Sequence, residues 1–169
     1  MPAPLSPGSF TLQPTRSSVR FTHKTMWGLV TVKGTFTGIR GSGAVAADGS
    51  GSGTLVIESA TLDTKNAKRD THLRSKDFFH AEQHPEITFT ASRITPGADG
   101  TAQVEGELTV RDTSRKLTFP VTVERDGADS VALRGEVRIP REDYGMGWNQ
   151  MGMIKGAATI ALDLRFAAA

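Results

Sequence analysis

Residues 66–89 read NAKRDTHLRSKDFFHAEQHPEITF, and they are the one stretch of the chain whose pattern is not that of a β-strand. Charged residues crowd its first half, the Phe78-Phe79 pair follows, and alternation resumes only at Ile87. Asn66 carries the side-chain oxygen of a helix N-cap, and Asp70 suits the positive end of a helix dipole. We therefore predict one short helical insert near Asn66-Phe79 that caps one end of a barrel.

The rest of the chain alternates apolar and polar residues with a period of two, which indicates half-buried strands. Residues 104–111 are typical: Val104, Gly106, Leu108 and Val110 share one face, and charged or hydroxyl residues share the other. One dry face favours antiparallel pairing, and the dry face must be buried by closure or by sandwiching. We predict an all-β fold, a closed barrel of about eight strands, with a two-sheet sandwich as the alternative. Residues 1–8 are expected to be loose, and residues 9–169 to form a single domain.

The inward face of these strands carries almost no charge. An eight-stranded barrel is just wide enough to be filled by its own residues or to hold one small ligand. Gly34, Gly106 and Gly135 fall on the inward face, where each either permits a bend or leaves room for a ligand. Strands of about ten residues span roughly 30 Å, which suits an extended lipid chain. The residues predicted to line the pore are Val30, Val32, Phe36, Leu55, Ile57, Phe78, Phe79, Phe89, Leu108, Val110, Phe119, Val121, Val137 and Ile139.

A second candidate for ligand contact is the Gly- and Met-rich stretch at residues 145–156, GMGWNQMGMIKG. Methionine side chains adapt to irregular apolar shapes. We predict that one mouth of the pore is lined by Met146, Trp148, Met151 and Met153; the alternative is an ordinary loop.

Composition excludes several classes of protein. The chain has 169 residues, a net charge of +2 and no cysteine, so disulfides, thiolate metal sites and cysteine nucleophiles are absent. Basic residues are interleaved with acids, which argues against nucleic-acid binding. No stretch approaches the roughly 20 apolar residues of a membrane span, and no signal-peptide pattern is visible, so a cytoplasmic protein is expected. A homodimer is left open.

The polar clusters suggest no firm chemistry. Arg69, Asp70 and His72 belong to the densest cluster, which would either contact a pyrophosphate or quinone head group or, as we favour, tie the helix to neighbouring loops. His80 and His84 have a metal-ligand spacing, but HAEQH is not the zincin motif and no third ligand is in view, so no metal site is predicted.

Two further classes of protein stay open from the residues alone. A hydrolase would need a nucleophile with a base and an orienting acid, and no nucleophile-elbow sequence is present. A haem-binding barrel would use His23 or His72 as the axial ligand.

An ordered series of segments carries a resemblance to a known family: SSVRFTHK (17–24), VKGTFTGIRG (32–41), residues 62–79, HPEITFTAS (84–92), residues 104–123 and REDYGM (141–146). The chain resembles the YceI-like family of polyisoprenoid-binding proteins over nearly its whole length. The resemblance implies an extended antiparallel eight-stranded, lipocalin-like barrel with a long isoprenoid or similar amphiphile in its pore, and no catalytic residue. Tyr144 stands where the family often has Phe. We therefore predict non-enzymatic binding, storage or transport of a polyprenyl or quinone-like lipid, with no required cofactor; a fatty acid or another amphiphile is the alternative.

Overall fold

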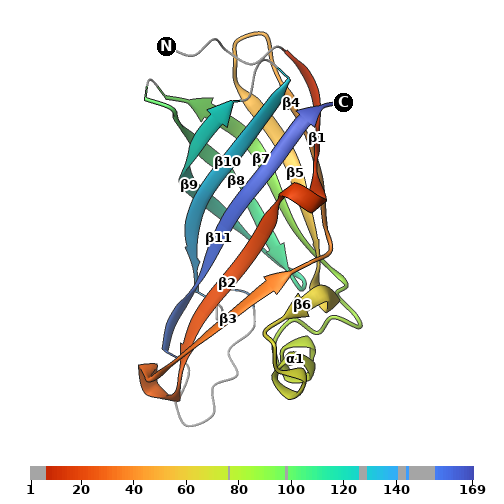
Figure 1. Cartoon of the computed structure of the whole chain (residues 1–169), viewed down its shortest axis with the longest axis vertical. Helices are drawn as coiled ribbons and strands as arrows, with labels where there is room; N and C mark the ends of the chain where they lie inside the picture. The colour runs from red at the N-terminus through yellow and green to blue at the C-terminus, as the bar shows by residue number, and fades with distance from the viewer. Residues whose placement is uncertain (1–6, 76, 98, 126–128, 141–143, 145–154) are drawn as a thin grey trace.

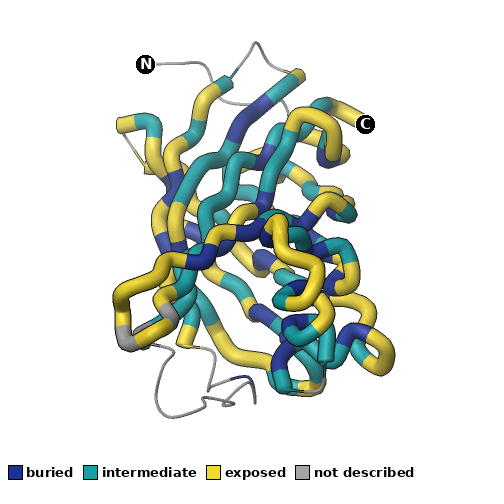
Figure 2. Tube along the Cα trace, turned by 60° about the horizontal axis from the view of Figure 1, so that its bottom comes forward, coloured by how far each residue is buried: buried dark blue, intermediate teal, exposed yellow. Residues whose placement is uncertain are grey.

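The fold is described here from a computed structural model, which describes residues 7–75, 77–97, 99–125, 129–140, 144 and 155–169. Within these residues the chain forms one sheet of eleven strands and one α-helix (Figure 1). Buried and exposed positions alternate along part of several strands, most regularly in β8 (Thr101–Val110), as the predicted period of two requires (Figure 2).

Eight strands close into a ring, and every neighbouring pair in it is antiparallel. Closure comes from β1, which pairs with β4 on one side and with the end of β11 on the other, where Phe10 faces Ala168. The predicted barrel is therefore confirmed, and the sandwich alternative is wrong. In order around the ring the strands are β1 (Gly8–Leu12), β4 (Ile39–Val45), β5 (Gly51–Glu58), β7 (Glu86–Pro96), β8 (Thr101–Val110), β9 (Thr113–Arg125), β10 (Ser130–Ile139) and β11 (Lys155–Ala168).

Three further strands extend the sheet below β1. β2 (Ser18–Thr25) takes over the edge of β11 after the short 3-10 turn η1 (Pro14–Arg16), and β3 (Val30–Phe36) and the two-residue β6 (Leu62–Asp63) follow. β2 and β3 are joined through a second 3-10 turn, η2 (Met26–Gly28). This hairpin projects at the same end of the molecule as the helix (Figure 1).

The alternating stretch 29–39 is divided between two strands. β3 pairs with β2, whereas β4 pairs with β1 and β5, so the chain must step sideways between them. Gly38 lies in the step, and its amide donates to the Thr61 hydroxyl over 3.0 Å. The buried positions shift parity at this step, from Val32, Gly34 and Phe36 in β3 to Ile39 in β4. The glycines and small residues that follow Ile39 leave little apolar pattern by which the sequence would show the shift.

Residues 41–47 have a weak pattern in the sequence, yet most of them form β4. Gly43 faces Gly53 across the ladder. A Cβ atom at Gly43 would lie 2.8 Å from the Ser52 carbonyl oxygen, and one at Gly53 would lie 2.7 Å from that of Ser42. β4 and β5 therefore pair here through close approach of their backbones, which only glycine permits, and not through contacts between apolar side chains.

One ladder of the ring is incomplete. β9 and β10 pair from Arg125↔Val131 to Thr122↔Arg134 and no further, although β9 reaches back to Thr113 and β10 continues to Ile139. Pro120, which has no N–H to donate, lies just beyond the last pair. Its outward position in the sequence favours an edge, a bulge or a rim, and the structure places it where the ladder between two neighbouring strands ends. We call the stretch between Thr113–Val121 and Gly135–Ile139 the β9–β10 seam.

The insert between β5 and β7 contains α1 (Ala67–Arg74). The predicted N-cap is confirmed, because the Asn66 side-chain oxygen accepts from the Arg69 amide over 3.1 Å. Leu73 and Phe78 are buried in the core, at 5% and 6% exposure. The turn after the helix is fixed by the Phe79 amide, which donates to the Leu73 carbonyl over 3.0 Å. The insert thereby lies at one end of the barrel, as predicted (Figure 1).

Candidate functional site

A cavity of about 580 Å³ runs inside the ring of strands. Its walls come from all eight barrel strands, from β2 and β3, and from the insert through Leu73, Phe78 and Phe79. The volume lies in the range of about 300–1,000 Å³ that small-molecule sites occupy. The interior is therefore not filled by the protein's own side chains.

Most of the predicted pore residues lie on this wall, namely Phe36, Leu55, Ile57, Phe78, Phe79, Phe89, Leu108, Val110, Phe119, Val121, Val137 and Ile139. Val30 and Val32 do not, and the structure corrects the prediction for both. Val30 is 43% exposed, and Val32 is buried at 2% without lining the cavity. Both belong to the part of β3 that leads from the hairpin tip, where the inward face of the strand no longer faces the ring. Met146, Trp148, Met151 and Met153 lie outside the described residues.

Other wall residues were absent from the prediction. They come from strands all around the ring and from β2, and those on β1, β2, β10 and β11 include Phe10, Val19, Phe21, His23, Leu133, Ile160, Leu162, Leu164 and Phe166. Each lies on the apolar face of an alternating strand, so the period of two in the sequence could have identified these residues as part of the wall. β2 and β11 line the cavity because they pair along Val19↔Leu162 and Phe21↔Ile160.

The inward glycines make room for aromatic rings. A Cβ atom at Gly34 would lie 2.4 Å from the Phe21 ring, and one at Gly106 would lie 2.7 Å from the Phe89 ring. A Cβ atom at Gly135 would lie 3.0 Å from both the Val121 side chain and the Pro120 carbonyl oxygen. The space directly above these glycines is thus taken by neighbouring protein atoms, and the room for a ligand lies elsewhere in the cavity.

The two ends of the cavity differ in chemistry. The end near the β4–β5 and β7–β8 turns is lined by small and polar residues, with Asp48 and Arg125 among them. Hydrogen bonds from the Ser50 hydroxyl and amide, 2.6 and 2.9 Å long, lower the pKa of Asp48. The opposite end is aromatic: the Phe79 ring meets the Phe36 ring edge-on with centroids 5.6 Å apart.

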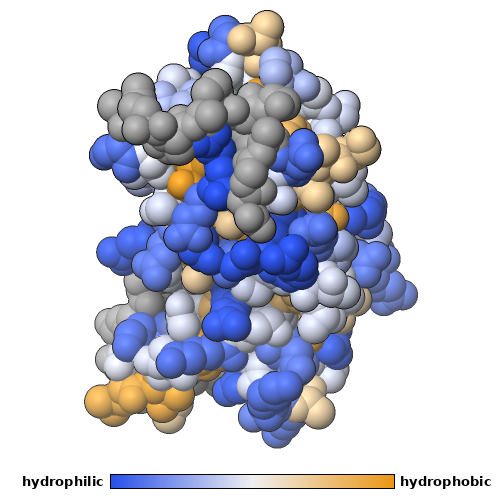
Figure 3. Space-filling view, turned by 45° about the horizontal axis from the view of Figure 1, so that its top comes forward, coloured by the Kyte–Doolittle hydropathy of each residue, from blue (hydrophilic) through white to orange (hydrophobic). Residues whose placement is uncertain are grey.

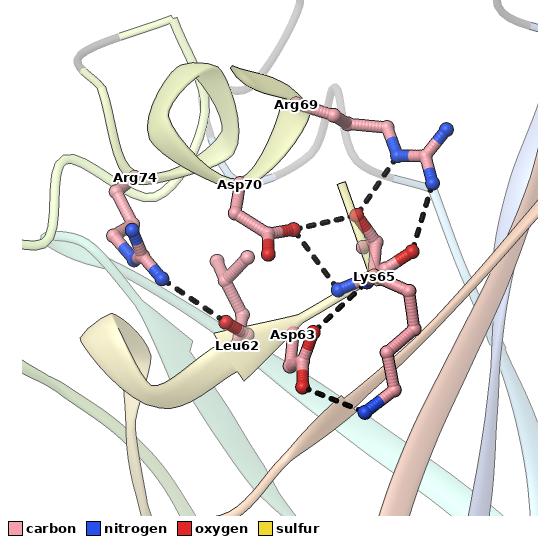
Figure 4. Close-up of polar contacts among 7 residues, drawn as sticks. Leu62, Asp63, Lys65, Arg69, Asp70 and Arg74 are labelled. Atoms are coloured by element: carbon pink, nitrogen blue, oxygen red, sulfur yellow. Dashed lines mark hydrogen bonds and ion pairs between the residues drawn. The ribbon is translucent and has the colours of Figure 1, made fainter. Parts of the chain in front are cut away.

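The polar cluster on the insert holds the helix in place (Figure 4). Asp70, 7% exposed, accepts from the Thr64 amide over 2.9 Å and from the Thr64 hydroxyl over 2.5 Å. Arg69 donates to the Thr64 hydroxyl and carbonyl oxygens, each over 2.9 Å. His72 lies 3.0 Å from an Asp77 carboxylate oxygen. None of Arg69, Asp70 and His72 lines the cavity. Their contacts tie the helix to neighbouring residues, which is the role that we favour from the sequence.

The histidines do not converge on a metal site in the part of the chain that is described, where no group of three or more potential ligands was found. The His80 and His84 rings lie 5.4 Å apart, and His84 Nδ1 lies 3.4 Å from an Asp112 carboxylate oxygen. His23 lines the cavity and stacks on Phe21 with centroids 6.2 Å apart. Of the two candidate haem ligands, only His23 therefore faces the cavity.

Two serines lie near a histidine that contacts an aspartate, the residue types a hydrolase would need. The Ser59 hydroxyl donates to the main-chain carbonyl of His84 over 2.8 Å, and the Ser75 hydroxyl donates to that of His72 over 2.5 Å. Each hydroxyl thus donates to a carbonyl oxygen rather than to an imidazole nitrogen. Neither serine is therefore arranged as a nucleophile with a histidine base.

None of the helices in the described ranges is long and apolar enough to cross a membrane.

Comparison with known proteins gives a consistent result. Residues 10–166 match the model of the YceI-like domain. The chain is 31% identical over 121 residues to the UPF0312 protein SA2479 of Staphylococcus aureus strain N315, covering 68% of this chain and 67% of that protein. It is 32% identical over 123 residues to the UPF0312 protein SERP2314 of Staphylococcus epidermidis, with 68% and 67% covered.

Two solved structures share the fold. The structure of BcnA from Burkholderia cenocepacia matches with a TM-score of 0.83 and 24% identity, over 91% of this chain and 98% of that one. A polyisoprenoid binding domain from Saccharophagus degradans, described as implicated in plant cell wall breakdown, matches with a TM-score of 0.76 and 18% identity, over 95% and 98%.

Proposed function

The chain belongs to the YceI-like domain family, and from this premise we propose that it binds a long isoprenoid-type lipid in the barrel cavity without catalysing a reaction. The lipid would be a polyprenyl or quinone-like amphiphile that the protein stores or carries. Support from a relative comes from the Saccharophagus degradans domain, which has the same fold and is described as polyisoprenoid binding.

The observation that carries the proposal is the chemistry of the cavity wall. Its long middle section is aliphatic and aromatic, contributed by strands all around the ring, and the only charged side chains on the described wall are Asp48 and Arg125 at one end. Such a wall offers few hydrogen bonds by which to orient a polar molecule. It suits a ligand whose free energy of binding comes from burying a hydrocarbon chain.

The energy available per unit of such a ligand is large. Each isoprene unit buries five carbons, and at about 0.8 kcal/mol per methylene-sized group this amounts to about 4 kcal/mol before the costs of association. A few buried units would therefore suffice for tight binding without a polar contact.

Native mass spectrometry tests the proposal directly. The freshly purified protein, and the protein incubated with a polyprenyl alcohol, should show a stoichiometric adduct, and the organic extract should identify the species. Ala91→Phe, which enlarges a buried wall residue, should reduce the adduct. The same enlargement on the outer face, Thr90→Phe, should leave it unchanged.

Other outcomes would lead to different conclusions. A fatty acyl adduct with no polyprenyl uptake would assign another amphiphile to the same cavity. A Soret band in the purified protein would point to haem at His23. A folded protein that takes up none of these ligands would refute the proposal. The compartment, predicted to be the cytoplasm, can be checked by fractionation of cells that express the full-length protein.

A further inference from the structure

The tip of the β2–β3 hairpin carries an unusual concentration of exposed apolar surface. Leu29 is 86% exposed, Met26 44% and Val30 43%, and these are the exposed large hydrophobic residues of the described chain. Met26 adopts a φ of 51°, a left-handed conformation that residues other than glycine seldom take. A patch of hydrophobic surface is visible at the lower left of the space-filling view, at the end where the hairpin projects (Figure 3).

The charged side chains of the hairpin itself all have one sign. No aspartate or glutamate occurs before Asp48, and the outer face of the hairpin presents Arg20, Lys24 and Lys33, all exposed. The Lys24 ammonium group donates to the Thr31 hydroxyl over 2.7 Å and retains further protons for a second acceptor. We call Arg20, Lys24 and Lys33 the basic collar of the hairpin. Apolar side chains next to basic ones are the pattern of a segment that inserts at the surface of an anionic bilayer.

We propose that the β2–β3 hairpin docks the protein onto an anionic lipid bilayer. Met26, Leu29 and Val30 enter the boundary between head groups and acyl chains, and Lys24 and Lys33 lie against the lipid phosphates. Lys24 precedes Met26 by two residues, or about 7 Å of strand, which is within the roughly 8 Å screening length of physiological salt.

A second copy of the chain fits this surface less well. A stable protein interface buries about 800 Å² on each partner, whereas the described side chains of this narrow hairpin include three large exposed apolar ones. Two hairpins meeting tip to tip would also bring their basic collars together. Charge and area therefore both favour a bilayer.

The docked orientation has a consequence for the cavity, although the proposal does not rest on the cavity's ligand. The tip lies at the same end as the insert (Figure 1), so docking would place the end closed by Phe78 and Phe79 toward the membrane. None of the three tip residues lines the cavity. Variants at the tip can therefore separate docking from ligand binding.

The test is flotation of the full chain with vesicles of phosphatidylcholine alone or mixed with phosphatidylglycerol. The protein should float with the anionic vesicles and not with the neutral ones. Met26→Gln with Leu29→Gln should weaken binding at least about tenfold. Lys24→Gln with Lys33→Gln should weaken it by about 25-fold, since each surface lysine contributes about fivefold. The matched control is Arg93→Gln with Lys116→Gln, which removes the same charge from other strands and should change binding little.

Equal flotation of the wild type and both tip variants, or no flotation with anionic vesicles, would overturn the proposal. A dimer that becomes monomeric in the Met26→Gln, Leu29→Gln variant would overturn it in favour of self-association. Uptake of a polyprenyl alcohol by the same variants, measured without vesicles, should match the wild type. Loss of vesicle binding with normal uptake thus supports docking alone, and normal docking without uptake refutes only the proposed function.

Discussion

Replacing Gly34 with alanine should test how tightly the barrel wall is packed around Phe21. Phe21 faces Gly34 across the β2–β3 ladder, and a new Cβ atom would lie 2.4 and 2.6 Å from two carbons of its ring and 2.9 Å from the Thr64 methyl group. Ordinary carbon contacts begin near 3.5 Å, so the ring must withdraw by about 1 Å. Because Phe21 lines the cavity, the available direction is into the space proposed for the ligand.

The size of the effect follows from two opposing contributions. Overpacking of a core by one methyl group costs about 1–3 kcal/mol, and replacing glycine with alanine recovers about 0.4–1 kcal/mol by restricting the unfolded chain. We expect Gly34→Ala to lower the free energy of unfolding by about 1–2 kcal/mol, and the melting temperature by about 2–8 °C for a domain of this size. Uptake of a polyprenyl lipid should fall as well.

Thermal unfolding followed by circular dichroism, together with lipid titration, checks this expectation. Gly51→Ala is the matched control, because its Cβ atom would lie 3.4 Å from Ile94 and should not destabilise the barrel. Adding Phe21→Leu to Gly34→Ala should restore part of the lost stability, since the clash involves the ring. A Gly34→Ala protein with wild-type stability and wild-type uptake would show that the wall yields easily and that this reasoning is wrong.

Three further predictions concern the insert and the surface. Asp70→Ala should lower the free energy of unfolding in urea by about 3 kcal/mol, because two charge-assisted hydrogen bonds to Thr64 are lost, whereas Asp63→Ala, which removes two hydrogen bonds from Lys65 at a more exposed carboxylate, should lower it by less. Phe79→Ala should speed dissociation of bound lipid in a stopped-flow exchange assay, since it removes one ring of the aromatic pair at the insert end; an unchanged rate would place the exit elsewhere. The pKa values of Asp48, Asp63 and Asp99 should lie below 3.8 in an NMR titration, because each carboxylate accepts hydrogen bonds from neighbouring residues; the stability they contribute should be present above pH 3.8 and be lost as the pH falls through the lowered values, and values at or above 3.8 would contradict the hydrogen bonds.

The sequence predicted the barrel, the helix and most of the cavity wall because each has a local signature. Alternation identifies the inward face of a strand, and Asn66 marks the start of the helix through its cap. The pairing of strands has no such signature. The sequence therefore did not predict the step at Gly38, or that β1 and β2 both pair with the same edge of β11. Val30 keeps the correct alternation yet lies beyond the ring, because alternation reports which face of a strand is apolar and not how far the barrel extends.

The contacts of the insert's polar cluster have no signature in the sequence. Arg69 and Asp70 both meet Thr64, and the spacing of the three residues alone is equally compatible with a head-group site. Likewise, the inward glycines are visible in the sequence, but the rings that cover them come from a neighbouring strand at Gly34 and from a diagonal position at Gly106.

The β9–β10 seam gives the barrel a property that a fully laddered tube lacks. A barrel whose strands are all paired has a fixed circumference, because widening it would break a whole row of hydrogen bonds at once. A barrel that lacks one ladder over part of its length has fewer hydrogen bonds to break when it widens along that line, while the neighbouring ladders, β8–β9 and β10–β11, stay intact. If the cavity binds a hydrocarbon chain as proposed, such a barrel would discriminate poorly between slender and methyl-branched chains, and selectivity would come from the length of the ligand and its polar end.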